Sequence, residues 1–169
     1  MNSLLKMIRK KLSKPIYVQI WEHRIRAVTI NSDGVFDEKP LVAIKTTSRD
    51  QKQVIEIGNS AEFSNRSNTV IVNPFSHPRV LLNDFQVGEK LLQHISLTLH
   101  KNPLIRPAPV IILHPMEKLE GGLTQIEKRA FRELAFGAGA SEIYLYSGTP
   151  LVTQSVDLNE LTARLEDTV

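Results

Sequence analysis

The sequence predicts a mixed α/β fold in which an antiparallel three-strand meander is followed by alternating strands and helices. Two observations support this class. The first third of the chain holds β-branched runs separated by tight turns, and the later part alternates helical stripes with short apolar runs. The 169 residues suit one domain with a sizeable core, since 41% of them are hydrophobic and 23% charged.

The meander is expected in the segment before residue 47. PIYVQI (15–20) and RIRAVTI (24–30) have the composition of strands, and a tight turn at Trp21 to His23 joins them. NSDG (31–34) is a turn, and LVAIKT (41–46) is expected to supply the third strand of the meander.

Shorter pieces follow, and then the first long helix. Extended runs are expected at 54–58 and 69–73, around a small helix near 61–63. Asn83 or Asp84 can cap the long helix, which Asn102-Pro103 stops. Its apolar stripe consists of Val87, Leu91, Leu92, Ile95 and Leu99.

The remaining chain alternates strands and helices. PVIILH (109–114) and EIYLY (142–146) read as buried strands. Between them, TQIE (124–127) is a capping box that opens a helix ending at GAGA (137–140). The apolar side of this helix includes Ile126, Ala130, Phe131 and Leu134. Asp157 then caps a short helix that carries Leu158, Leu161 and Leu165.

Positive charge is concentrated near the N-terminus. Five basic residues and no acidic one precede Glu22, which leaves 16 of the 21 basic residues against all 18 acidic ones in the rest of the chain. A general nucleic-acid binder is therefore disfavoured, because its basic patch would lie on the folded domain. The absence of cysteine excludes disulfides and fits a reducing compartment. No apolar run approaches the roughly 20 residues that span a bilayer.

Residues 1–14 have the pattern of an amphipathic helix that lies in a membrane interface. Aliphatic side chains gather on one side, and basic side chains occupy the other together with Asn2 and Ser13. A disordered basic tail and a helix packed on the protein's own core are the alternatives. The residues expected at the membrane are Leu4, Leu5, Lys6, Ile8, Arg9, Lys10, Lys11, Leu12 and Lys14.

Several stretches carry a resemblance to a known family. These are PLVAIKT, IGNSAE, NPF followed by DFQVGEKLLQHI, RPAPVIILHP and, above all, LTQIEKRAFRELAFGAGASEIYL. The chain resembles the bacterial actin MreB family from about Met1 to Leu151, which is less than half of a family member. The resemblance implies an actin-like, ribonuclease-H-like half domain at 15–152, preceded by the membrane helix at 1–14. We expect residues 153–169 to form a helical tail that docks on this subdomain through its leucines.

The same resemblance locates a phosphate loop at the end of the first strand. The family has Asp-Leu-Gly-Thr there, where the Asp serves nucleotide-bound magnesium and the small residues let backbone N–H groups approach phosphate. This sequence has Gln19, Ile20, Trp21 and Glu22. Gln19 brings no charge to magnesium, Trp21 cannot replace glycine, and Glu22 would repel a phosphate. We interpret this turn as a degenerate phosphate loop, with Trp21 expected to fill the emptied cleft rather than form an exposed contact.

Two further departures agree with this interpretation. SGTP (147–150) replaces the family's Glu-Glu-Pro, one of whose glutamates helps to position the attacking water, and the second phosphate loop is expected to lie beyond this sequence. HPMEKLEGGL (114–123) is longer than the family's loop and is interpreted as a solvated insertion, with a contact surface at its charged tip as the alternative. The five histidines, at positions 23, 77, 94, 100 and 114, lack metal-ligand spacing. We therefore expect no catalytic residue, no nucleotide or other cofactor, and no metal.

These features favour a non-enzymatic adaptor that is cytoplasmic and peripheral to the inner face of the cytoplasmic membrane. Its expected partners are an anionic membrane surface and full-length MreB or other cell-shape proteins, with no nucleic acid. One alternative is a scaffold subunit of another membrane machine, such as a pilus or secretion apparatus. A nucleotide-dependent actin-like ATPase is the other, and it would need the missing pocket from another chain.

Overall fold

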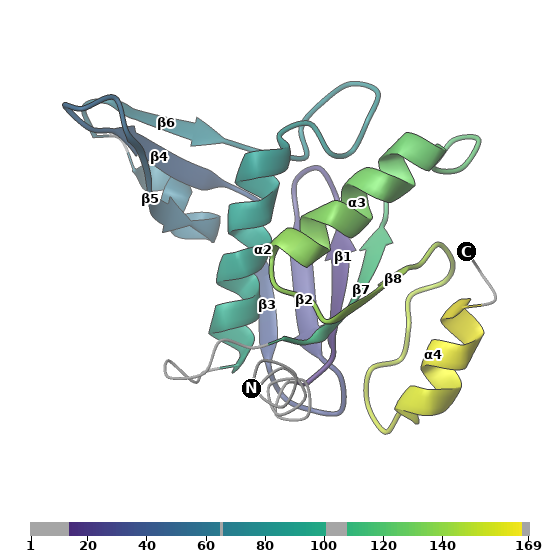
Figure 1. Ribbon diagram of the computed structural model, residues 1–169. Coiled ribbons are helices and arrows are strands. Elements are labelled where there is room, and N and C mark those ends of the chain that lie inside the picture. The colour runs from purple at the N-terminus through teal and green to yellow at the C-terminus, as the bar shows by residue number, and fades with distance from the viewer. Residues whose placement is uncertain (1–13, 65, 101–107, 167–169) are drawn as a thin grey trace, which may run out of the picture.

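Two β-sheets and their covering helices make up the described part of the chain (Figure 1). The computed structural model describes residues 14–64, 66–100 and 108–166. The predicted N-terminal helix, apart from Lys14, and the Asn102-Pro103 helix stop lie outside these ranges. Among the described helices, none combines the length and the apolar character needed to cross a membrane.

The larger sheet has five strands in the order β3-β2-β1-β7-β8. Strands β1 (Ile16–Ile20), β2 (Ile25–Thr29) and β3 (Val35–Glu38) form the antiparallel meander. Strands β7 (Val110–Pro115) and β8 (Glu142–Leu145) run parallel to β1. The carboxyl ends of β1, β7 and β8 therefore meet at one edge of the sheet.

The smaller sheet is antiparallel and has the order β5-β4-β6. It consists of β4 (Val42–Thr46), β5 (Lys52–Ile57) and β6 (Thr69–Val72), with the short helix η1 (Gly58–Phe63) after β5. The expectation that residues 41–46 complete the meander is wrong. Val35–Glu38 takes that place, although two of its four residues are acidic, because Phe36 alone needs to face the core.

Helices cover both faces of the larger sheet. Helices α2 (Phe85–His100) and α3 (Gln125–Gly137) lie on one face, and α4 (Leu158–Glu166) lies on the other (Figure 1). The alternate residues Ile16, Val18 and Ile20 of β1 point into the core under α2 and α3. Tyr17 points to the opposite face, where it packs in a second cluster. That cluster also contains Val28, Ile30, Ile112, Leu161 and Leu165.

The helical stripes and caps agree with the sequence in most positions. All five predicted stripe residues of α2 are buried, and the Asp84 carboxylate accepts the Val87 N–H at 3.0 Å. Thr124 and Glu127 form the reciprocal capping box of α3. Ile126 was expected on the apolar side, yet it is 82% exposed because the side of α3 that carries Phe131 and Leu134 faces the sheet. EIYLY was expected to be buried, but β8 is an edge strand with mostly half-buried side chains.

Candidate functional site: the turn after strand β1

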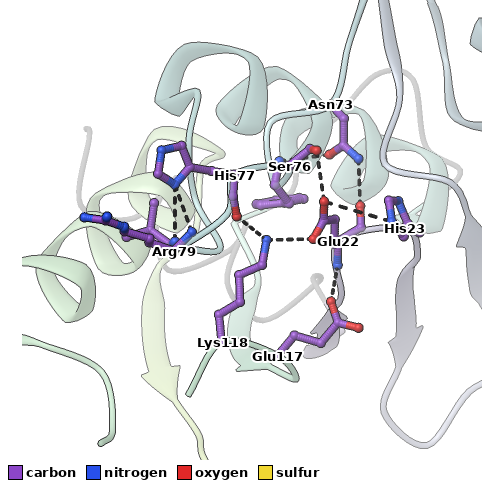
Figure 2. A network of polar contacts seen from close by, with 10 residues as sticks. Glu22, His23, Asn73, Ser76, His77, Arg79, Glu117 and Lys118 are labelled. Atoms are coloured by element: carbon purple, nitrogen blue, oxygen red, sulfur yellow. Dashed lines mark hydrogen bonds and ion pairs between the residues drawn. The ribbon is translucent and has the colours of Figure 1, made fainter. Parts of the chain in front are cut away.

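The turn Trp21 to His23 lies at the carboxyl edge of β1, the edge at which sheets with parallel strands commonly bind ligands. The Trp21 N–H donates to the Arg24 carbonyl at 2.9 Å and closes the turn. Two other loops reach it, one after β6 and one after β7, and Figure 2 shows the polar contacts between the three. Because these loops bond to groups of the turn, those groups are not free to bind a ligand.

Glu22 is the centre of this network (Figure 2). Its backbone N–H donates to the Glu117 carboxylate at 2.7 Å, and its carbonyl accepts from the Asn73 amide at 2.7 Å. Its own carboxylate pairs with the Lys118 ammonium at 2.7 Å and accepts from the Ser76 hydroxyl at 3.0 Å. Lys118 also donates to the His77 carbonyl. The backbone and the side chain of Glu22 are thus both engaged by neighbouring loops.

The network keeps Glu22 ionised. The hydrogen bond from Lys118 is the main reason that the pKa of Glu22 lies below its ordinary value of 4.5, and the hydrogen bond from Ser76 adds to the effect. The Lys118 side chain is only 16% exposed, so the pair is partly shielded from water. Two carboxylates, from Glu22 and Glu117, and one ammonium, from Lys118, contact this turn. Its charge balance is therefore unfavourable for a phosphate.

Gln19 stands where the resemblance implies a magnesium-serving aspartate. Its side chain is 6% exposed and neutral, and its amide oxygen accepts from Arg26 at 3.4 Å. The amide nitrogen points to the sulfur of Met116 at 3.8 Å. A cation at this point would meet an uncharged amide beside a guanidinium. Across the described residues, no three His, Asp or Glu side chains form a group that could hold a metal ion.

Trp21 and Ile20 complete the predicted degenerate loop. Ile20 is fully buried in the core between the sheet and α2 and α3. Trp21 is half-buried, and the Arg24 guanidinium lies 5.4 Å from its ring centroid, in cation–π geometry. Arg24 is held in turn by a bidentate pair with Asp37. The expectation that Trp21 fills the emptied cleft stays a prediction, since the described contact of its ring is with Arg24 and the residue is half-buried.

The loop after β7 differs from its prediction. The segment 114–123 was read as a solvated insertion, which fits only the exposed residues 120–122. Glu117 and Lys118 are half-buried because they bond to Glu22. Sequence reasoning also missed Asn73 and Ser76, since nothing local in NPFS indicates a partner 51 residues earlier in the chain. Ser147 to Pro150, which replaces the family's acidic motif, is exposed.

Of the residues expected at the membrane, only Lys14 is described. It is exposed, and its ammonium donates to the Ser32 hydroxyl at 2.8 Å. The others lie outside the described residues.

Comparisons with known proteins agree with this fold. The family model described as MreB/Mbl protein matches residues 24–156. The cell shape-determining protein MreB of Escherichia coli K12 is 31% identical over 147 residues, which cover 84% of this chain and 40% of the relative. The MreB of Pasteurella multocida is 29% identical over 146 residues, with the same coverage. An uncharacterized Escherichia coli protein, YjaA, is 34% identical over 97 residues.

Solved structures show the same architecture. MreB5 of Spiroplasma citri bound to ADP has a TM-score of 0.56 and 17% identity, over 79% of this chain and 38% of that one. Its complex with AMPPNP has a TM-score of 0.58 and 19% identity. The fold is therefore actin-like, and the chain spans about 40% of the length of the curated relatives it matches. Because the family model matches most of the sequence, the chain belongs to the MreB/Mbl family.

Proposed function

We propose that this chain is a non-enzymatic, MreB-like adaptor that sits on the inner surface of the cytoplasmic membrane and binds filaments of full-length MreB. The observation that carries the proposal is that the turn after β1 has its polar groups bonded within the chain. The Glu22 N–H donates to the Glu117 carboxylate, and the Glu22 carboxylate forms an ion pair with Lys118.

The turn offers little to a nucleotide. Phosphate-binding loops present free backbone N–H groups and cationic side chains, which act by position and charge. Here a phosphate would have to displace the Glu117 carboxylate and then face the Glu22 carboxylate at close range. The related MreB5 structures contain ADP and AMPPNP. In this chain, the charge and the occupied donors support a nucleotide-independent role.

Binding to a filament fits the fold. The chain matches 38% of each MreB5 structure, so the described residues present part of an actin-like surface. That part can offer one side of a contact between subunits, through which this chain would decorate or cap a filament.

The N-terminal segment supports a location at the membrane. Its aliphatic and basic residues form opposite sides of a helix in the sequence pattern, which suits an anionic lipid surface. Each basic residue near such a surface contributes on the order of 1 kcal/mol.

Co-sedimentation and vesicle flotation test the two parts of the proposal. Filaments of Escherichia coli MreB should pellet this chain in proportion to filament mass, and full-length MreB below its polymerisation threshold should not. Absence from the filament pellet, together with retention on vesicles, would favour a scaffold of another membrane machine.

For the membrane, vesicles containing anionic lipid should float with the wild type but not with a variant carrying Leu5→Glu and Ile8→Glu. A matched control carries Asn2→Glu and Ser13→Glu, which make a similar charge change on the polar side of the helix. Equal loss in both variants would show that charge alone governs binding and would refute insertion of the apolar side.

A further inference from the structure

The segment after β8 returns across the second face of the larger sheet and ends in α4 (Figure 1). We call residues 147–166 the C-terminal strap. Asn31 holds one part of it, since the Asn31 N–H donates to the Thr153 carbonyl at 2.9 Å. The Asn31 side chain bonds to both backbone groups of Val156, at 2.7 and 2.8 Å. These contacts involve only neutral groups.

A second attachment lies under residues 148–151 and contains a buried histidine. His114, on β7, is 2% exposed, and its Nδ1 is hydrogen-bonded to the Tyr17 hydroxyl of β1. The Leu151 N–H donates to the same hydroxyl oxygen at 3.3 Å. The Gly148 backbone also acts on the imidazole, where it opposes the lowering of the His114 pKa by burial. His114 and Tyr17 thus connect the middle of the sheet to the strap at Leu151.

The partners fix the protonation state of the ring. The Tyr17 oxygen accepts from the Leu151 N–H, and among the described residues His114 Nδ1 is the acceptor within hydrogen-bond distance of the Tyr17 O–H. The Tyr17 O–H therefore donates to an unprotonated Nδ1, so the neutral ring carries its proton on Nε2. Every polar group in this chain of bonds is satisfied only when His114 is neutral.

Among the described residues, the side chains in contact with this ring are uncharged. The ring of Tyr146, the residue after β8, lies edge-on to the imidazole at 4.8 Å between centroids, and the Tyr17 ring of β1 lies 5.8 Å from it. Arg26, on β2, is a cation whose charge lowers the pKa of Tyr17, so it offers no compensation for a proton on His114. No carboxylate among the described residues acts on His114, and its burial lowers its pKa from the ordinary 6.5.

We propose that His114 is a pH-sensitive anchor of the C-terminal strap: the neutral ring holds residues 148–151 on Tyr17, and protonation releases the strap and α4 from the sheet. A proton on Nδ1 removes the acceptor of the Tyr17 O–H and places an unpaired charge among aromatic rings. Release restores water to the imidazolium. This device goes beyond the proposed function, since it depends only on contacts within the chain.

The sign of the effect follows from linkage. A released His114 titrates near 6.5, and the docked ring titrates lower. The equilibrium constant for release of the strap is therefore at its lowest above pH 6.5. It rises as the pH falls below that value. One proton is taken up per opening, so the rise is up to about tenfold per pH unit until the docked pKa is reached.

Hydrogen exchange of the full chain between pH 5 and pH 8 tests this device. Expressed as protection factors, which remove the intrinsic pH dependence of exchange, the amides of Leu151, Val156 and Leu161 should lose protection by up to about tenfold per unit below pH 6.5. Amides of α2 and β4 in the same sample should not. His114→Gln should abolish the pH dependence in the strap.

His94 supplies a matched control. It lies on α2 on the opposite face of the sheet, beside Phe36, and burial lowers its pKa as well. His94→Gln should leave the pH dependence of the strap unchanged. If His114→Gln fails to fold, Tyr17→Phe removes the hydroxyl and should lower protection at Leu151 at every pH. The proposal is overturned if strap protection does not change with pH, if α2 and β4 lose protection equally, or if His114→Gln keeps the wild-type slope.

Discussion

Truncation of Leu161 to alanine tests whether α4 contributes to the folded state. Leu161 is 6% exposed and packs with Tyr17, Val28 and Ile112 on the second face of the sheet. Leu→Ala changes at buried sites cost about 2–5 kcal/mol, through lost transfer energy and the cavity left behind. A short helix packed beside the edge strand β8 can shift to close part of the cavity, so we expect a loss of roughly 2–3 kcal/mol.

Urea unfolding followed by circular dichroism measures this loss. With an m-value of about 2 kcal/mol per molar, the midpoint should fall by about 1–1.5 M. Asn159→Ala, on the exposed side of the same helix, should change the free energy of unfolding by less than about 0.5 kcal/mol. An equally small change in Leu161→Ala would refute the reasoning, because it would mean that α4 is undocked in solution.

Three further predictions follow from local contacts. Thr124→Ala should destabilise the protein by about 1 kcal/mol in the same assay, because the capping box of α3 is lost. Lys118→Met should raise the pKa of Glu22 toward its ordinary 4.5, measured by carboxyl NMR titration; an unchanged value would show that Lys118 does not hold that carboxylate. The lowered pKa of Glu22 also means that its stabilisation is present above pH 4.5 and is lost as the pH falls through the folded value. Glu22→Gln should therefore flatten the acid side of the stability profile, and a profile identical to wild type would contradict this.

Local pattern was enough to predict most elements but not the sheet to which each strand belongs. The residues 42–46 have the β-branched composition of a strand, and they form one. Whether that strand pairs with β2 or with β5 depends on contacts that its own residues do not encode. The third strand of the meander is Val35–Glu38, which its two acidic residues made unlike a strand in composition. It forms an edge strand because Phe36 alone is buried in the core.

The candidate site shows the same limit. Trp21 and Glu22 stood out because they replace small residues of the family's loop. Their consequences depended on Asn73 and Glu117, which are 51 and 95 residues away from Glu22 in the chain. His114 likewise lies at the end of an apolar run in the sequence, which gives no sign of a partner. That partner, Tyr17, lies 97 residues earlier. Contacts of such separation are set by the topology of the sheet, which places β1 beside β7.

Calorimetric titration of the full chain with ATP and magnesium tests the central claim most directly, with Escherichia coli MreB as the comparison protein. The occupied Glu22 N–H and the two carboxylates at the turn predict no saturable heat up to millimolar nucleotide. Saturable binding at micromolar nucleotide would contradict the account, because it would mean that Glu117 and Glu22 yield the turn to a phosphate.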